Sequence, residues 1–320
     1  MDQTAAAPGS LADPGVPGSG HGDDTIGSGP HVKLNLPSAL HWLRRIAGIV
    51  PFGAYVTLGL LLPMVAVAVG AFQGNNGGFT FSNVSAATHG IYLHGFWQSI
   101  ILSVLTSILP AICGLLIAYA IFTAKRGNVL RQMTITASGV FANFGGVPLA
   151  FLFIASAGST GLITHWLANV GLNIYNWGFS LYSLSGVIVV YFYFQVPLMV
   201  LIILPALEGL RPAWREAAEN MGARTWQYWR YVGGPVLLPS FLGCVLLLFG
   251  SALSAYATAE ALTNGTIPLT AIQIGSFLNG NVIAGQENIG KALGLGMVII
   301  IAIAMIIYVA MQRRAAKWLR

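Results

Sequence analysis

The segment between the fourth and fifth apolar runs carries charged and small residues side by side. Arg215 and Glu216 stand directly before Ala217 and Ala218, and Gly222 follows after three more residues. Charged side chains form strong, charge-assisted hydrogen bonds, and alanines allow another surface to approach closely. The pattern predicts a surface that meets another protein, and the alternative is a solvated loop.

The same segment contains the signals for two short helices. Pro212 suits the first helical position, because a backbone N–H at that position would have no partner within the helix and proline has none to leave unpaired. Residues 213–221 then favour a helix, and Gly222 can end it with a left-handed C-cap. Thr225 can cap a second helix. We therefore expect a helix–turn–helix beneath the membrane, with its aromatic residues towards the headgroups.

This loop resembles the EAA motif of binding-protein-dependent ABC importer permeases. That motif reads Glu-Ala-Ala, three residues, Gly, nine residues, an aliphatic residue, one residue and Leu-Pro. Glu216, Gly222, Val232 and Pro235 stand at the matching positions, whereas Gly234 replaces the usual Leu. The order of the spans is most similar to the polyamine, iron, thiamine and phosphonate branch of these permeases.

The resemblance covers about residues 50–320 and implies an all-α polytopic protein with six transmembrane helices, in the type I ABC importer permease fold. The loop at about 208–234 would be a coupling helix, seated in a groove of a cytoplasmic ABC ATPase subunit. The implied partners are two such ATPases, a second permease subunit, identical or homologous, and an extracytoplasmic substrate-binding protein. ATP and Mg would be bound by the ATPases, and no cofactor by this chain. The residues expected to make the ATPase coupling contact are Arg215, Glu216, Ala217, Ala218 and Gly222.

Residues 285–292 nearly match a phosphate-binding loop, G-x-x-x-x-G-K-[ST]. Ala292 occupies the position of the Mg²⁺ ligand, and no strand is predicted before the stretch. We therefore expect no ATPase site here and assign Gly290 and Gly294 to close helix contact. His89 and His94 do not share a helical face, so no metal site is predicted.

Polar residues in the apolar spans predict a path for a solute. Ser251, Ser254 and Thr258 have the spacing of one helical face, and the glycines beside Asn143 predict an interrupted helix. Polar groups at membrane depth usually face a cavity or another helix, so helix packing is the alternative for each one. The predicted path consists of Asn143, Tyr193, Gln195, Ser251, Ser254, Tyr256, Thr258 and Glu260.

The chemistry of this path leaves several solutes open. Glu260 and the tyrosines suit a cationic polyamine through charge and cation–π contact. They also suit other small polar solutes.

The composition sets the context for these residues. Charged residues make up 8% of the 320 residues, against roughly 25% in a soluble domain. A helix needs about 20 apolar residues to cross a bilayer. Six stretches meet this length, with no charged residue near their centres, at about residues 47–72, 97–122, 133–157, 184–207, 235–257 and 292–311.

The basic residues predict the orientation of these spans. They gather before the first span, after the second, after the fourth and after the sixth, and the other loops hold only Lys291. Basic flanks stay in the cytoplasm, so the chain is expected in a prokaryotic plasma membrane with both termini on the cytoplasmic side. Residues 1–40, rich in Gly, Pro, Ala, Ser and Asp, are expected to be a disordered cytoplasmic tail before a permease domain at 41–320.

The alternative function is a secondary transporter driven by an ion gradient. Such a protein would be expected to carry ionisable residues inside its spans. The six predicted span centres contain none, and no motif of an intramembrane enzyme is found. The sequence therefore favours a transport subunit that is not itself an enzyme.

Overall fold

Nearly all of the described chain is helical. The computed structural model describes residues 50–74, 77–124, 127–172, 174–280 and 286–318. Residues 50–56 are helical and belong to a unit of their own, whereas Thr57–Arg320 forms a second, compact unit. The helices of the second unit, in chain order, are η1 (Thr57–Leu61), α2 (Leu62–Ala71), α3 (Ser82–Ala87), α4 (Gly90–Thr123), α5 (Val129–Asn143), α6 (Gly146–Ala157), α7 (Leu162–Asn169), η2 (Ile174–Trp177), α8 (Leu184–Glu208), α9 (Pro212–Asn220), α10 (Thr225–Tyr228), η3 (Trp229–Gly233), α11 (Gly234–Ser254), α12 (Tyr256–Thr263), α13 (Thr270–Leu278) and α14 (Glu287–Trp318).

Six helical segments among the described residues are long and apolar enough to cross a membrane. They are Val50–Ala71, Gly90–Thr123, Gly146–Asn169, Leu184–Glu208, Thr225–Ser254 and Glu287–Arg313. Five of them overlap the predicted spans along most of their length, whereas the third begins at Gly146 and covers only the second half of the stretch predicted at 133–157. Helix α5 ends at Asn143 and α6 begins at Gly146, so the helix is interrupted where the glycines predicted a break.

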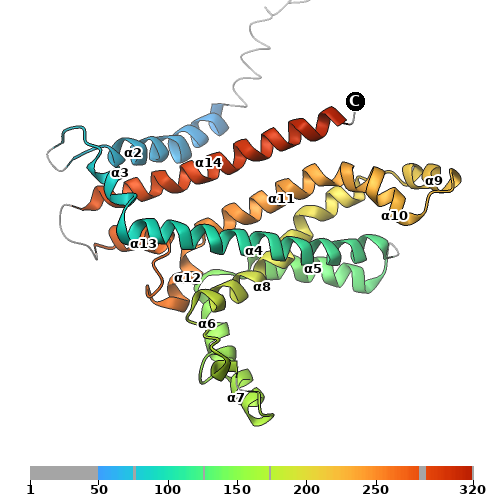
Figure 1. Ribbon diagram of the computed structural model, residues 1–320, viewed down its shortest axis with the longest axis horizontal. Helices are drawn as coiled ribbons and strands as arrows, with labels where there is room; N and C mark the ends of the chain where they lie inside the picture. Colours follow the sequence, from blue (N-terminus) through green and yellow to red (C-terminus); the bar gives the residue numbers. More distant parts are fainter. Residues whose placement is uncertain (1–49, 75–76, 125–126, 173, 281–285, 319–320) are drawn as a thin grey trace, which may run out of the picture. The chain divides into compact units, whose positions relative to one another are not determined.

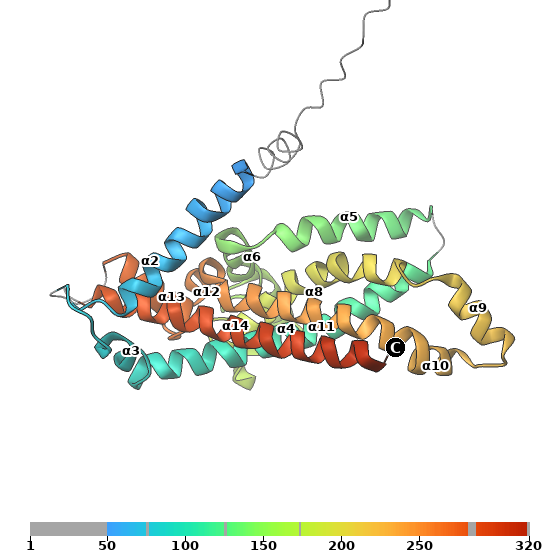
Figure 2. The same ribbon diagram turned by 90° about the horizontal axis from the view of Figure 1, so that it is seen from above.

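Helix α8 is the central element of the second unit. Helix α4 packs along it and along α11, and α5 packs along another side of α8 (Figures 1 and 2). Buried residues of α8 belong to two apolar clusters, one around Val187 and Val190 and the other around Met199, Ile203 and Leu207. A helix that is apolar all round belongs in a protein core or a membrane span, and the buried residues of α8 are covered by its neighbours.

Small residues allow the helices to approach closely. Gly114 of α4 faces the Met199 side chain of α8, where an added Cβ would come within 2.6 Å of the Met199 Cβ. Gly290 faces Phe277 of α13, and Gly294 lies near Val67 of α2. The predicted close helix contact is therefore confirmed at Gly290, whereas an added Cβ at Gly294 would make only an ordinary contact with Val67.

The basic residues are unequally distributed between the two ends of the second unit. One end, the α9 end, holds α9, α10, the C-terminal ends of α4, α8 and α14, and the N-terminal ends of α5 and α11 (Figure 1). Lys291 lies in the first turns of α14, at the opposite end. Lys125, Arg126 and the predicted tail at 1–40 lie outside the described residues. The described arginines on elements of the α9 end are Arg131, Arg211, Arg215, Arg224, Arg230, Arg313 and Arg314.

Candidate functional site: helix α9 and the broken helices

Helix α9 is closed by local hydrogen bonds. Pro212 is its first residue, as predicted. At its C-terminal end, the Gly222 N–H donates to the Glu219 carbonyl at 2.9 Å and the Ala223 N–H donates to the Ala218 carbonyl at 3.0 Å. Gly222 has a φ of 78°, the left-handed conformation that glycine adopts at low cost. These are the features of a Schellman motif, so the predicted C-cap is confirmed.

Helix α10 begins in a different way from the prediction. Its N-cap residue is Arg224, whose backbone N–H donates to Gln227 Oε1 at 2.7 Å. Thr225 is already the first helical residue, so its hydroxyl stands one position too late to cap the helix. The predicted Thr225 cap is therefore wrong: the helix begins one residue earlier, and the side chain that bonds its N-cap residue is that of Gln227.

The glycine pair before α11 has a local explanation. A Cβ at Gly233 would come within 2.9 Å of the Trp229 ring, and one at Gly234 within 2.5 Å of the Trp229 carbonyl oxygen. The π-helical turn η3 thus requires glycine at both positions. Gly234, which stands where the EAA motif usually has Leu, thus fits the close approach of the Trp229 carbonyl.

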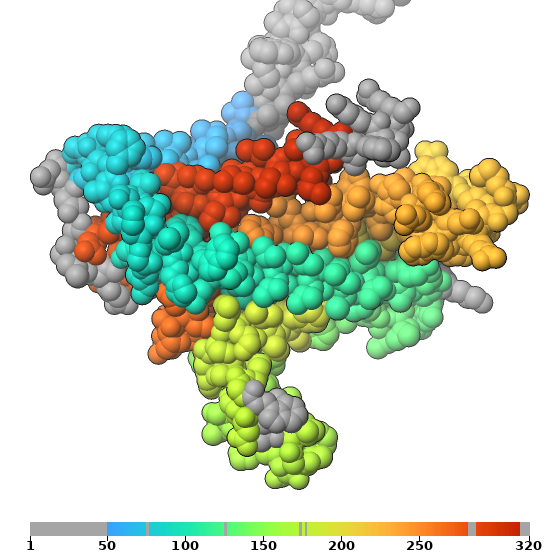
Figure 3. Space-filling view, in the orientation of Figure 1, coloured from blue at the N-terminus to red at the C-terminus, as the bar shows by residue number. Residues whose placement is uncertain are grey.

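Helix α9 presents a mixed surface. Arg215, Glu216 and Ala217 are exposed, whereas Ala218 is 5% exposed and faces its own chain. Arg215 Nε donates to Glu219 Oε1 at 2.8 Å, and this bond raises the pKa of Arg215 above its ordinary value. Within the described part of the chain, Glu216 forms no ion pair. Figure 3 shows α9 and α10 at one end of the packed helices, uncovered by any other segment on the face drawn.

Two helices break beside each other in what we call the helix-break region, formed by Phe144, Gly145 and Ala255. The break in α5–α6 covers Phe144 and Gly145, and the break in α11–α12 lies at Ala255. Helix α6 packs along α12. The Gly146 N–H donates to Thr258 Oγ1 at 2.9 Å, and the Tyr191 hydroxyl donates to the Ala255 carbonyl. Each broken helix thus has a backbone group at the break satisfied by another helix.

The structure divides the predicted path. Gln195 is fully buried in α8 and donates from Nε2 to the Leu248 carbonyl of α11 at 3.2 Å. Thr258 is 3% exposed and accepts from Gly146. Both side chains therefore join helices. The predicted single face of Ser251, Ser254 and Thr258 is wrong, because the break at Ala255 places Thr258 on a separate helix.

Other predicted path residues remain accessible. Tyr193 is half-buried, with its ring 5.8 Å from that of Phe141 and 5.6 Å from that of Phe153, which lie on opposite sides of the α5–α6 break. Asn143 is exposed and donates from Nδ2 to the Gly139 carbonyl of its own helix.

A cavity of about 340 Å³ lies beside the end of α11. Ser254 and Tyr256 line it together with Asn279 and Met297, and Ser251 is half-buried one turn away. Glu260 is half-buried further along α12, and its Oε2 is buried without a hydrogen-bond partner among the described residues. Among the predicted path residues, Gln195 and Thr258 are therefore buried, and the others are exposed or half-buried.

Two contacts were missed by the sequence prediction. One is the Tyr191 hydroxyl bond to Ala255, and the other is an ion pair between Arg131 and Glu208. The signal for the ion pair was present, because both residues flank spans at the same end and have opposite charges.

The structure also describes most of the near match to a phosphate-binding loop and the residues considered for a metal site. Gly285 lies outside the described residues, and the stretch from Glu287 to Ala292 forms the first turns of α14. In the described part of the chain, no group of three or more His, Cys, Asp and Glu residues is placed to hold a metal ion.

Comparison with known proteins identifies the family. Residues 84–320 match the family described as "Binding-protein-dependent transport system inner membrane component". The chain belongs to this family. The permease is 29% identical over 175 residues to the thiamine transport system permease protein ThiP of Escherichia coli, covering 53% of this chain and 30% of ThiP. It is 24% identical over 237 residues to the sulfate transport system permease protein CysW of Synechocystis sp., covering 74% of this chain and 80% of CysW.

The permease spans about a third of the length of the thiamine permeases that it matches. A solved bacterial ABC transporter "involved in the import of the acidic polysaccharide alginate" shares its fold, with a TM-score of 0.69 over 86% of this chain and 96% of that one, at 19% identity. The chain is therefore a multi-pass inner-membrane permease component of a binding-protein-dependent transport system and not its ATPase. This replaces the alternative of an ion-gradient-driven transporter.

Proposed function

We propose that this permease forms the translocation path of a bacterial ATP-driven importer, and that α9 is its coupling helix. The observation that carries the proposal is the exposed face of α9, with Arg215, Glu216 and Ala217 on a helix closed by the Gly222 motif. A short helix with a fixed end can pass on a displacement as a rigid body. The surface suits a groove of a cytoplasmic ABC ATPase.

The mechanism follows from the position of α9 in the chain. Only three residues separate α9 from α8, and α8 packs against α4, α5 and α11. When two ATPase subunits close on ATP and Mg, two coupling helices move, one from this chain and one from a second permease subunit. The motion passes into α8 and its neighbours, and the path opens towards a binding protein that carries the solute.

The orientation belongs to the same proposal. We place the α9 end in the cytoplasm, with both termini inside, because the described arginines gather there and basic flanks are retained on that side. Cysteine at position 224 should react with a membrane-impermeant thiol reagent only in inverted vesicles. Cysteine at position 264 should react in intact cells, and the reverse pattern would overturn the topology.

We infer that the solute is small, polar and cationic. Glu260 keeps one carboxylate oxygen buried without a partner among the described residues. A charge in such a partly desolvated position is screened less by salt than one on an open surface. The relatives are named for thiamine, sulfate and ferric transport, and none of these solutes is a polyamine. We therefore assign the path a small cationic solute of the thiamine kind.

The test is uptake by the reconstituted complex. The permease is placed in proteoliposomes with its partner ATPase subunits and the binding protein, and labelled candidate solutes are added with and without ATP. Uptake should require ATP, the ATPases and the binding protein together. Uptake driven by a proton or sodium gradient without ATP would contradict the proposal.

A further inference from the structure

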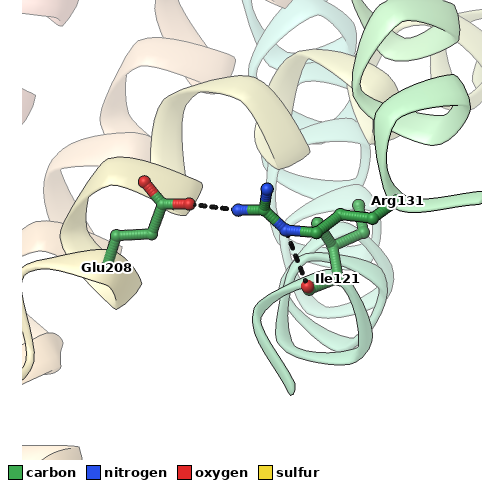
Figure 4. Close-up of polar contacts among 3 residues, drawn as sticks. All are labelled: Ile121, Arg131 and Glu208. Carbon is green, nitrogen blue, oxygen red and sulfur yellow. Dashed lines mark hydrogen bonds and ion pairs between the residues drawn. The ribbon is translucent and has the colours of Figure 1, made fainter. Parts of the chain in front are cut away.

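Three helix ends meet at one arginine at the α9 end. Arg131, near the start of α5, donates from Nη2 to Glu208 Oε1 of α8 at 2.5 Å. It also donates from Nε to the Ile121 carbonyl of α4 at 3.3 Å. Figure 4 shows the guanidinium between these two partners. The planar group can bind both at once because its donors point in fixed, divergent directions.

Both contacts satisfy groups that a helix end leaves exposed. Ile121 lies in the last turn of α4, where the final carbonyls have no partner within the helix. Glu208 is the last residue of α8, where a carboxylate meets the negative end of the helix dipole. Arg131 provides a donor for the carbonyl and a positive charge for the carboxylate.

This ion pair differs from the other one in the described residues. The Arg215–Glu219 pair lies within α9, with side chains 56% and 51% exposed. The Arg131–Glu208 pair joins two helices, with side chains 17% and 39% exposed. Glu208 is followed after three residues by α9, and Leu210 between them is buried. Arg131 thus joins the end of α8, from which the chain leads into α9, to α4 and α5.

We propose that Arg131 is a positioning residue for coupling, through which the displacement of α9 reaches α5 as well as α8. This inference rests on the proposed role of α9. Helix α5 packs along α8 and ends at the break that leads to α6. The ion pair therefore connects the start of α5 to the last residue of α8, three residues before α9. The other end of α5 leads into the helix-break region. Loss of the pair is expected to reduce coupling, and the thermal midpoint of each variant separates this effect from a loss of stability.

The experiment uses the full complex in proteoliposomes and measures solute taken up per ATP hydrolysed. Arg131→Gln and Glu208→Gln should each lower this ratio about 3- to 30-fold, the range found when a residue on a coupling route is changed. The exchange Arg131→Glu with Glu208→Arg should recover part of this loss, because the charge pair re-forms while the bond to the Ile121 carbonyl does not. Arg131→Lys should give an intermediate ratio, since an ammonium lacks the guanidinium fork. Arg313→Gln, an exposed arginine at the same end of another helix, is the matched control and should leave the ratio unchanged.

Three outcomes would overturn the inference. The first is a wild-type ratio in both single variants. The second is a thermal midpoint that falls in proportion to the ratio in every variant, with no recovery in the exchange. The third concerns the case in which Arg131→Gln does not insert into the membrane. In that case, a wild-type ratio of uptake to ATP hydrolysis in Arg131→Lys would overturn the inference. Gly222→Pro separates the two proposals, because loss of uptake in that variant beside normal coupling in the Arg131 variants would remove only the role of Arg131. Normal uptake in Gly222→Pro would remove the role of α9 as well.

Discussion

The α9 segment and the helix-break region satisfy their polar groups over very different distances along the chain. In α9 and α10 the partners are three to five residues apart, as in the bonds from Gly222 to Glu219 and from Ala223 to Ala218. In the helix-break region the partners are 112 residues apart for Gly146 and Thr258, and 64 apart for Tyr191 and Ala255. A locally closed helix can move as a piece, whereas a region joined over long distances changes only when several helices move together. The comparison predicts different failures at the two places.

The largest effect is expected in α9 from Gly222→Pro. Proline cannot adopt the φ of 78° observed here, and it lacks the N–H that donates to Glu219. With a penalty of about 3 kcal/mol, uptake and solute-stimulated ATP hydrolysis should fall about tenfold or more while the permease still inserts. Glu216→Lys, which reverses an exposed charge, should act in the same direction.

The control for Gly222 separates backbone strain from coupling. Gly222→Ala and Gly265→Ala place the same side chain at φ values of 78° and 74°, each with open space around the new Cβ. Both should introduce about 1–2 kcal/mol of local strain. Uptake should fall only in Gly222→Ala. Equal losses at both positions would show that α9 has no special part in coupling.

The next effect is expected in the helix-break region from Thr258→Val. The change removes the acceptor of the Gly146 N–H, and loss of such a cap costs about 1 kcal/mol. The thermal midpoint and uptake should both fall, because the first turn of α6 loses its tie to α12. Thr258→Ser should behave like the wild type. Thr263→Val is the matched control, since the buried Thr263 hydroxyl binds only the Ala259 carbonyl of its own helix.

A smaller and more selective effect is expected from Glu260→Gln. Loss of the charge should reduce uptake of a cationic solute about threefold, in keeping with partly exposed charge pairs. An anionic solute should be unaffected or favoured. Glu287→Gln, an exposed carboxylate in the first turn of α14, is the control. Equal uptake of the cation by both variants would place Glu260 among the packing residues.

The smallest effect is expected from Arg215→Gln, measured as the stability of the isolated permease. An exposed pair four residues apart on a helix contributes about 0.3–0.5 kcal/mol. The free energy of unfolding should change by no more than this amount, and the difference should shrink at high salt. A loss above about 1 kcal/mol would mean that Arg215 has a further structural contact.

The same contrast explains which features could be predicted from the sequence. Pro212, the helix after it and the Gly222 cap were predicted because their chemistry lies within one short segment. The break after Asn143 was also predicted, since two adjacent glycines mark it. The break at Ala255 was not, because no glycine or proline signals it and the carbonyl that it frees is satisfied by Tyr191 from a distant helix.

The path residues show the limit of helical spacing as a guide. Gln195 and Thr258 were predicted to face a solute because polar side chains in apolar spans often do so. Both are buried in contacts between helices, which depend on where α11 and α6 lie. Ser254 and Tyr256 do line a cavity, although their spacing alone did not distinguish them from Thr258.

The bond between Gly146 and Thr258 also has a consequence for how the protein is made. A chain inserted from its N-terminus presents the start of α6 long before the residue that caps it has been synthesised, since 112 residues separate the two. Until α12 arrives, the Gly146 N–H has no Thr258 to bind, and the α5–α6 segment must wait in another conformation or in the insertion machinery. In ribosome-bound chains that end before Thr258, a cysteine at position 145 should therefore react with a small membrane-permeant thiol reagent, whereas in chains that extend well beyond α12 it should be protected.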